Sequence, residues 1–160
     1  MYRQDYAQFP IFAGLDGNQI SQLSPFMTEC QFHKDEIIFE QGQPASHLYI
    51  LLSGNVIVRY KPYDGPPLTV ANIEPGGVFG WSAALGRETY TSSAVTVQES
   101  VAVRVRGSNL QVIRAQYPET GKILMDRLAG VITERLHSSH TQVLEILTRG
   151  FDVDGNWFKE

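Results

Sequence analysis

The chain has 160 residues, about the length of one domain and enough to bury a hydrophobic core without disulfides. Hydrophobic residues make up 42% and charged residues 19% of it, a balance typical of globular rather than disordered proteins. The net charge of −4 offers no overall positive field to nucleic acid or to anionic lipid. The single cysteine, Cys30, excludes an intramolecular disulfide and a metal cluster built from the cysteines of one chain.

The N-terminal region shows no pattern for export or for membrane insertion. No run approaches 18 apolar residues and the N-terminus lacks the apolar core of a signal peptide, so we expect a cytoplasmic protein that does not enter a membrane. Residues 16–23 are predicted to form a short helix, because Leu15, Ile20 and Leu23 share one helical face. Asp16 is the expected N-cap of this helix.

The middle of the sequence consists of short β-type segments separated by Gly, Pro and Asp. Side chains alternate over residues 55–60 as in a half-buried strand, and Gly42 and Gly54 lie where hairpins need a positive φ. Eight such segments predict a mainly β domain with flanking helices, an eight-stranded jelly roll or double-stranded β-helix barrel. The predicted strands cover residues 26–32, 36–40, 47–53, 55–60, 68–73, 78–80, 93–97 and 101–106.

Two helices are expected after the β-region. Ser108 is a suitable N-cap for a short helix over residues 109–117. Pro118 is predicted to begin a long helix, since proline at the first helical position sacrifices no hydrogen bond, and Gly150 is predicted to end it. The expected organisation is a domain over 1–150, with the β-roll at about 26–107 and the long helix at about 118–149, and a tail at 151–160.

The long helix carries two apolar stripes. One has the alternating four-and-three spacing of a coiled-coil seam and predicts a homodimer through this helix. The other is predicted to pack on the β-roll, and packing of the whole helix on its own domain is the alternative. The apolar residues of the tail could pack on the domain or on a partner protein. The seam comprises Met125, Ala129, Ile132, Leu136, Ser139, Val143 and Ile146, and the second stripe comprises Leu124, Leu128 and Val131.

Three separated stretches match one family in the same order. Residues 37–60 read IIFEQGQPASHLYILLSGNVIVRY, residues 75–97 read PGGVFGWSAALGRETYTSSAVTV, and residues 125–146 read MDRLAGVITERLHSSHTQVLEI. The first two resemble the opening hairpins and the phosphate-binding cassette of the cyclic-nucleotide-binding domains, and the third resembles the dimerisation helix of the Crp/Fnr regulators. Those regulators continue into a DNA-reading module where only about ten residues follow Gly150 here, so we expect no DNA binding by this chain alone.

The resemblance implies a site for a small anionic ligand such as a cyclic nucleotide. In the family, amides at the start of a short helix after a Phe-Gly pair receive the cyclic phosphate. The corresponding residues here are Phe79, Gly80, Trp81, Ser82, Ala83 and Ala84. The family places a glutamate for the ribose where this chain has Trp81, and an arginine for the phosphate where it has Ser92. Because each lost charged contact removes about ten- to a hundredfold in affinity, we expect cyclic AMP or cyclic GMP to bind weakly.

Neighbouring side chains offer replacements for the two missing contacts. Arg87 either substitutes as the phosphate partner or is a solvated loop residue. Trp81 either fills the vacant ribose position or stacks on a ligand base. The hydroxyls of Thr91, Ser92 and Ser93 could donate hydrogen bonds to an anion, although such runs are also common at strand starts.

The long helix adds two candidate ligand contacts by resemblance. Ser139 and His140 align with positions that touch the base in catabolite-activator-like members, and their alternative role is that of seam and surface residues of a coiled coil. A hydroxyl at Ser139 suits hydrogen bonding to a base edge, and His140 would make such a contact sensitive to pH.

The sequence therefore predicts a non-catalytic regulatory or ligand-sensing domain with a degenerate phosphate-binding cassette, which signals through a dimerisation helix. The alternative is a ligand-free scaffold that uses the same fold for dimerisation. Eight-stranded rolls also include metal-dependent enzymes, but the four histidines form no His/Glu cluster on strands, so we expect no enzyme and no metal site. A haem sensor with His33 or His47 as axial ligand is a further alternative.

Overall fold

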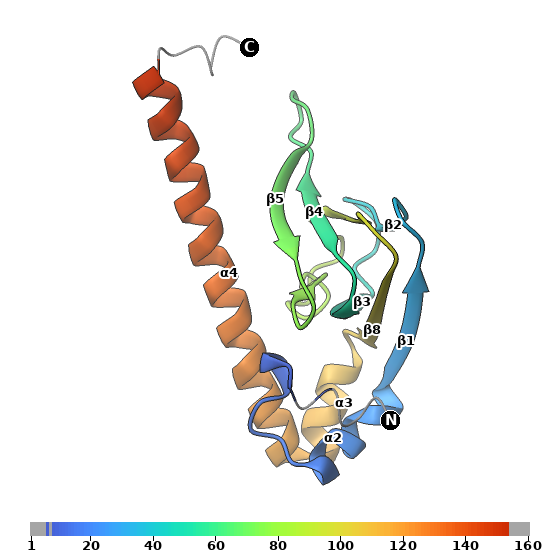
Figure 1. Ribbon diagram of the computed structural model, residues 1–160. Helices are drawn as coiled ribbons and strands as arrows, with labels where there is room; N and C mark the ends of the chain where they lie inside the picture. The colour runs from blue at the N-terminus through green and yellow to red at the C-terminus, as the bar shows by residue number, and fades with distance from the viewer. Residues whose placement is uncertain (1–5, 7, 154–160) are drawn as a thin grey trace.

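The computed structural model describes residue 6 and residues 8–153, except for the side chains at 138–140, 142, 143, 145, 146 and 149–153. In this part of the chain, short helices precede a β-roll and two further helices follow it (Figure 1). The helical elements are η1 (Pro10–Phe12), α2 (Gly17–Leu23), η2 (Ser24–Phe26), α3 (Asn109–Gln116) and α4 (Pro118–Val153). The strands are β1 (Met27–Phe32), β2 (Ile37–Phe39), β3 (His47–Ser53), β4 (Val56–Tyr60), β5 (Leu68–Ile73), β6 (Val78–Phe79), β7 (Ser93–Thr96) and β8 (Ser100–Arg106).

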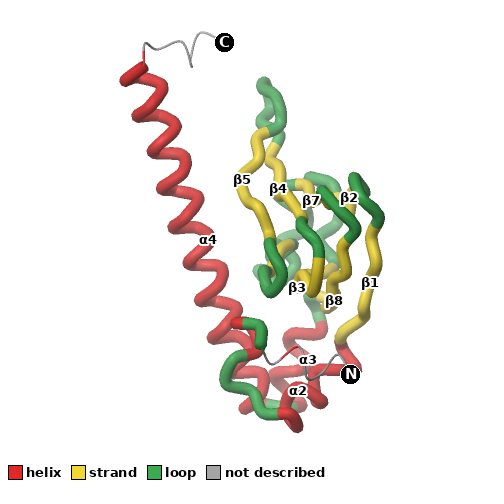
Figure 2. Tube along the Cα trace, in the orientation of Figure 1, coloured by secondary structure: helices red, strands yellow, loops and turns green. Residues whose placement is uncertain are grey.

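The strands of the described region form two antiparallel sheets of four strands each, in the orders β1-β8-β3-β6 and β2-β7-β4-β5 (Figure 2). This confirms the predicted eight-stranded jelly roll, and each predicted strand differs from the observed one by at most one residue at either end. Gly54, between β3 and β4, has φ +96°, and a Cβ at this position would collide with Ser100 and with the Glu99 carbonyl. A positive φ at the hairpin glycines Gly42 and Gly54 is also confirmed.

Two hydrophobic clusters hold the domain together. One fills the interior of the roll and comprises Phe39, Tyr49, Leu51, Val56, Ile73, Phe79, Tyr90, Ala94 and Ala102. The other joins the helices to the outer side of β3 and β8, and includes Phe12, Leu23, Ile50, Val103, Ile113 and Leu128. Burial of large apolar side chains in both clusters supplies the main driving force for this arrangement.

The helix starts follow the sequence signals to different degrees. Asp16 caps α2 as predicted, with a capping box in which its side chain accepts the N–H of Gln19 at 2.8 Å and the Gln19 side chain accepts the N–H of Asp16 at 3.0 Å. Ser108 occupies the N-cap position of α3 but its side chain makes no capping hydrogen bond. Pro118 is the first residue of α4, where its missing N–H has no intrahelical acceptor to lose.

Helix α4 runs along one side of the β-roll and ends about level with the tip of the β4–β5 hairpin in the view of Figure 1. The prediction that Gly150 ends it was wrong, since the helix continues to Val153. A glycine inside a helix costs only about 1 kcal/mol relative to alanine, which a helix of 36 residues can absorb. None of the described helices combines the length and the apolar character needed to cross a membrane.

The two apolar stripes of α4 have different environments. Leu124 and Leu128, from the stripe predicted to face the roll, are buried in the helical cluster. Of the predicted seam, Ile132 is partly buried against the same cluster, whereas Leu136 is 58% exposed. The side chains of the later seam positions Ser139, Val143 and Ile146 lie outside the described residues, so the seam as a whole stays a prediction.

Candidate functional site

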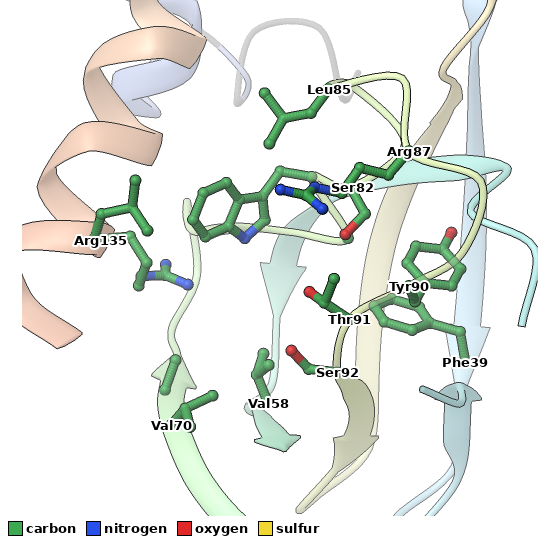
Figure 3. Close-up of a pocket in the computed structure, with 14 residues that line it drawn as sticks. Phe39, Val58, Val70, Ser82, Leu85, Arg87, Tyr90, Thr91, Ser92 and Arg135 are labelled. Carbon is green, nitrogen blue, oxygen red and sulfur yellow. The ribbon is translucent and has the colours of Figure 1, made fainter. Parts of the chain in front are cut away.

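A pocket of about 300 Å³ lies between the roll, the loop that follows β6 and helix α4 (Figure 3). This volume is at the lower end of the range for small-molecule sites, about 300–1,000 Å³. Strands β2, β4 and β5 contribute Phe39, Val58, Val70 and Ala71 to its wall. The loops between β6 and β7 contribute Gly80, Trp81, Ser82, Leu85, Arg87, Tyr90, Thr91 and Ser92, and α4 contributes Arg135 and Leu136.

Most of the residues singled out in the cassette line this pocket, namely Gly80, Trp81, Ser82, Arg87, Thr91 and Ser92. Four others lie elsewhere. Phe79 is fully buried in the roll interior, and Ala83 and Ala84 line a neighbouring open groove instead. Ser93 begins β7, where its hydroxyl accepts the N–H of Gln41 at 2.8 Å. The side chains of Ser139 and His140, also candidates, lie outside the described residues.

The segment after the Phe-Gly pair is a series of turns rather than the expected short helix. Gly80 has φ +74°, and a Cβ there would approach the His47 carbonyl to 3.0 Å, so this corner requires glycine. One bond with α-helical spacing forms, from the Leu85 N–H to the Trp81 carbonyl at 3.1 Å, before the chain reverses at Gly86 with φ +76°. Among the described residues, the N–H groups of Trp81 and Ser82 find no acceptor and remain available to a ligand.

Tyr90 fixes the far rim of the pocket to strand β3. Its ring stacks on Phe39 with centroids 3.8 Å apart and an interplanar angle of 15°. Its hydroxyl donates to the His47 carbonyl at 2.6 Å and accepts the His47 N–H at 3.0 Å. Burial raises the pKa of Tyr90, so the phenol stays protonated and able to donate. The Tyr90 hydroxyl is therefore committed to the scaffold rather than to a ligand.

Arg135, on α4, is a lining residue that the sequence analysis missed. In Figure 3 its guanidinium reaches from the helix toward the pocket, and its Nη2 lies 3.5 Å from the Val78 carbonyl. Burial lowers the pKa of Arg135, because desolvation disfavours the charged form. The pocket lining described contains no Asp or Glu that would offset this cost. The available signal was its position one helical turn before Ser139, on the same face of the helix.

The remaining polar groups of the pocket are also hydrogen-bond donors. Arg87 is exposed, and Figure 3 places its guanidinium beside Ser82 at the opposite side from Arg135. Within the described residues, no hydrogen bond or ion pair engages the side chains of Arg87, Ser82, Thr91 or Ser92. Two guanidinium groups, three hydroxyls and two unengaged amides can together accommodate a negatively charged group.

Trp81 borders the pocket without closing it. The residue is half-buried and packs partly against the helical cluster, and about 300 Å³ remains beside it. An indole that fills the expected ribose position would therefore leave most of this pocket open. Among the described residues, no group of three or more His, Cys, Asp or Glu side chains is placed to hold a metal ion.

Comparison with known proteins places this pocket in a family context. The sequence model of the cyclic nucleotide-binding domain matches residues 29–117. The chain is 27% identical over 154 residues to a CRP-like cAMP-activated global transcriptional regulator of Mycobacterium tuberculosis, covering 96% of this chain and 66% of the regulator. The chain thus spans just under two thirds of that relative's length.

Two solved structures share the fold over most of the chain. A cyclic nucleotide-binding domain from Methylobacillus flagellatus superposes with a TM-score of 0.83 at 19% identity, over 90% of this chain and 83% of that one. A putative cyclic nucleotide-binding protein from Geobacter metallireducens superposes with a TM-score of 0.72 at 27% identity, over 86% of this chain and 99% of that one. By its sequence match, which covers more than half of its residues, this chain belongs to the cyclic nucleotide-binding domain family.

Proposed function

We propose that this chain is a non-catalytic regulatory domain that senses a small anion and signals its presence through helix α4. The observation that carries this proposal is the shared wall of the pocket: Arg87 from the cassette loop and Arg135 from α4 line the same cavity. A ligand that contacts both would bind one conformation of the helix more tightly than another, which is the requirement for any ligand-driven shift.

The cassette of this domain is proposed to be degenerate toward cyclic nucleotides. Trp81 and Ser92 both line the pocket, at the positions where the family resemblance implies a ribose-binding glutamate and a phosphate-binding arginine. The mycobacterial relative is described as cAMP-activated, but that property does not transfer to a pocket that lacks both contacts. We therefore expect cyclic AMP and cyclic GMP to bind at least a hundredfold more weakly than to a pocket that has both residues.

The output of the domain is proposed to be a homodimer formed through α4. In its second half, the helix presents exposed apolar side chains, with Leu136 at 58%, Leu144 at 54% and Leu147 at 40% exposure. These three leucines lie within about a quarter of the helix circumference, given the rotation of about 100° per residue. A second copy that packs along this face would cover them and would connect the two pockets through Leu136, which lines the cavity.

Saturable stabilisation by a ligand tests this proposal. The melting temperature of the wild type is measured against a panel of phosphate- and carboxylate-bearing metabolites that includes cyclic AMP and cyclic GMP. A ligand that binds only the folded state raises the melting temperature by mass action, to a degree set by its concentration over its Kd. Sensing predicts at least one such ligand, with the shift reduced in Arg135→Gln. The alternative, a ligand-free scaffold for dimerisation, predicts a dimer whose melting temperature responds to none of them.

A further inference from the structure

The walls of the pocket distinguish between classes of anion. Its apolar part is formed by Phe39, Val58, Val70 and Leu136, together with the ring of Tyr90. The Tyr90 hydroxyl is already engaged with His47, so the ring offers only apolar surface to the cavity. A ligand body that carries many hydroxyl groups would lose its hydrogen bonds to water against such walls, at a cost of about 1–3 kcal/mol for each unpaired group.

The charge of the pocket points to the head group of the ligand. Arg87 and Arg135 bring two formal positive charges to the lining, and none of the described lining residues carries a negative charge. Figure 3 shows Thr91 and Ser92 below Arg87, and Val58 and Val70 at the bottom of the view, on the side away from Arg87. Planar guanidinium groups pair with phosphate or carboxylate oxygens through parallel hydrogen bonds. A dianionic head offers oxygens to both arginines and balances both charges.

On the basis of the proposed function, we propose that the ligand of this pocket is an aromatic dianion without a sugar. Its phosphate-type head is held by Arg87 and Arg135, and its flat apolar body lies against Val58 and Val70. In this arrangement Trp81, which occupies the position of the family's sugar-binding glutamate, adds apolar surface where a sugar hydroxyl would require an acceptor. One of the two charge partners of the ligand, Arg135, then belongs to α4, whereas the family resemblance implies a phosphate arginine at the position of Ser92.

Isothermal titration calorimetry with four matched probes tests this ligand class. Phenyl phosphate carries both the dianion and the aromatic body, inorganic phosphate lacks the body, benzenesulfonate has the same shape with one charge, and glucose 1-phosphate replaces the ring by a sugar. We expect phenyl phosphate to bind at least about tenfold more tightly than each of the other three, since loss of one charged contact or of a buried ring is worth at least that factor.

Three arginine variants locate the site. Arg135→Gln and Arg87→Gln should each weaken phenyl phosphate binding by about tenfold or more, because each removes a charge-assisted contact. Arg114→Gln is the matched control, since Arg114 lies on α3 with its side chain on Gln111, away from the lining, and should leave binding unchanged. Circular dichroism melts of each variant alone verify that it folds.

The outcomes distinguish failure of this inference alone from failure of the proposed function. Equal or tighter binding of glucose 1-phosphate or cyclic AMP, lost in Arg135→Gln, would overturn the aromatic class while leaving a ligand-sensing domain. Phenyl phosphate binding that is unaffected by both arginine variants would place it elsewhere and overturn the inference. If no probe and no metabolite of the panel binds, the inference and the proposed function both fail, and the scaffold alternative is favoured.

Discussion

If the cassette is degenerate as proposed, introducing a glutamate at Trp81 and an arginine at Ser92 should create a cyclic nucleotide site. Trp81 and Ser92 both line the pocket, so the side chains of Trp81→Glu and Ser92→Arg would start at its wall. Each charge-assisted contact is worth about 1.5–3 kcal/mol, and two at the low end give about 3 kcal/mol, or roughly a hundredfold in Kd. The double variant should therefore bind cyclic AMP about a hundredfold more tightly than the wild type, and more tightly than either single variant.

The substitution at Trp81 also has a cost that must be measured separately. The indole is half-buried and packs partly on the helical cluster, so a carboxylate there should lower the free energy of unfolding by about 1–2 kcal/mol. Calorimetry of cyclic AMP on the wild type and the three variants gives the affinities, and urea unfolding of the same four proteins gives the stabilities. Ser92→Arg alone serves as the variant that leaves this packing intact.

Two results would refute this reasoning. Micromolar or tighter binding of cyclic AMP by the wild type would mean that Arg87 or Arg135 already replaces the missing phosphate contact. Absence of binding by a folded double variant would mean that the amides of Trp81 and Ser82 do not form a cradle for the phosphate.

Three further predictions concern assembly and stability. Sedimentation equilibrium of the wild type should give twice the 17.9 kDa chain mass, and a monomeric wild type would contradict the dimer. Leu144→Asp, which alters a 54% exposed side chain of α4, should give the monomer. Tyr90→Phe leaves the N–H and carbonyl of His47 without their partner and should lower the free energy of unfolding by about 1–3 kcal/mol, whereas Tyr63→Phe, at a fully exposed ring, should have no effect. Gly54→Ala should destabilise the roll by more than about 1 kcal/mol, because Gly54 has a positive φ and a Cβ there would collide with Ser100. Gly130→Ala, on α4 with open space around it, should instead stabilise the protein by about 0.5–1 kcal/mol, and equal effects of the two variants would contradict the turn geometry.

The fold was predictable because its signals are local. Alternating side chains and glycines with positive φ marked the strands to within one residue, and Asp16 and Pro118 marked helix starts through hydrogen bonds made within a few residues. Local signals failed where the surrounding residues determined whether a helix forms or ends. Gly86 reverses the chain before the residues after Gly80 complete a helix, and the helix around Gly150 continues despite the glycine.

The site was predictable only on the side that the cassette supplies. Six of the predicted cassette residues line the pocket as a contiguous loop would suggest, but the residues from the other walls come from distant parts of the chain. Arg135 follows Ser92 by more than 40 residues and faces the cassette only because Leu124 and Leu128 anchor the start of α4 in the helical cluster. Phe39 and Tyr90 likewise meet because β2 pairs with β7, a pairing that no local pattern of side chains specifies.

Amide hydrogen exchange along α4 tests the central claim most directly, because it measures the protection of the helix amides while the ligand occupies the pocket. The account predicts that saturating phenyl phosphate slows exchange in the helical turns around Arg135 and Leu136 of the wild type, and that Arg135→Gln abolishes this protection at the same occupancy. Protection confined to the loop around Ser82 and Arg87, with α4 unchanged in both proteins, would contradict the claim that the helix senses the ligand.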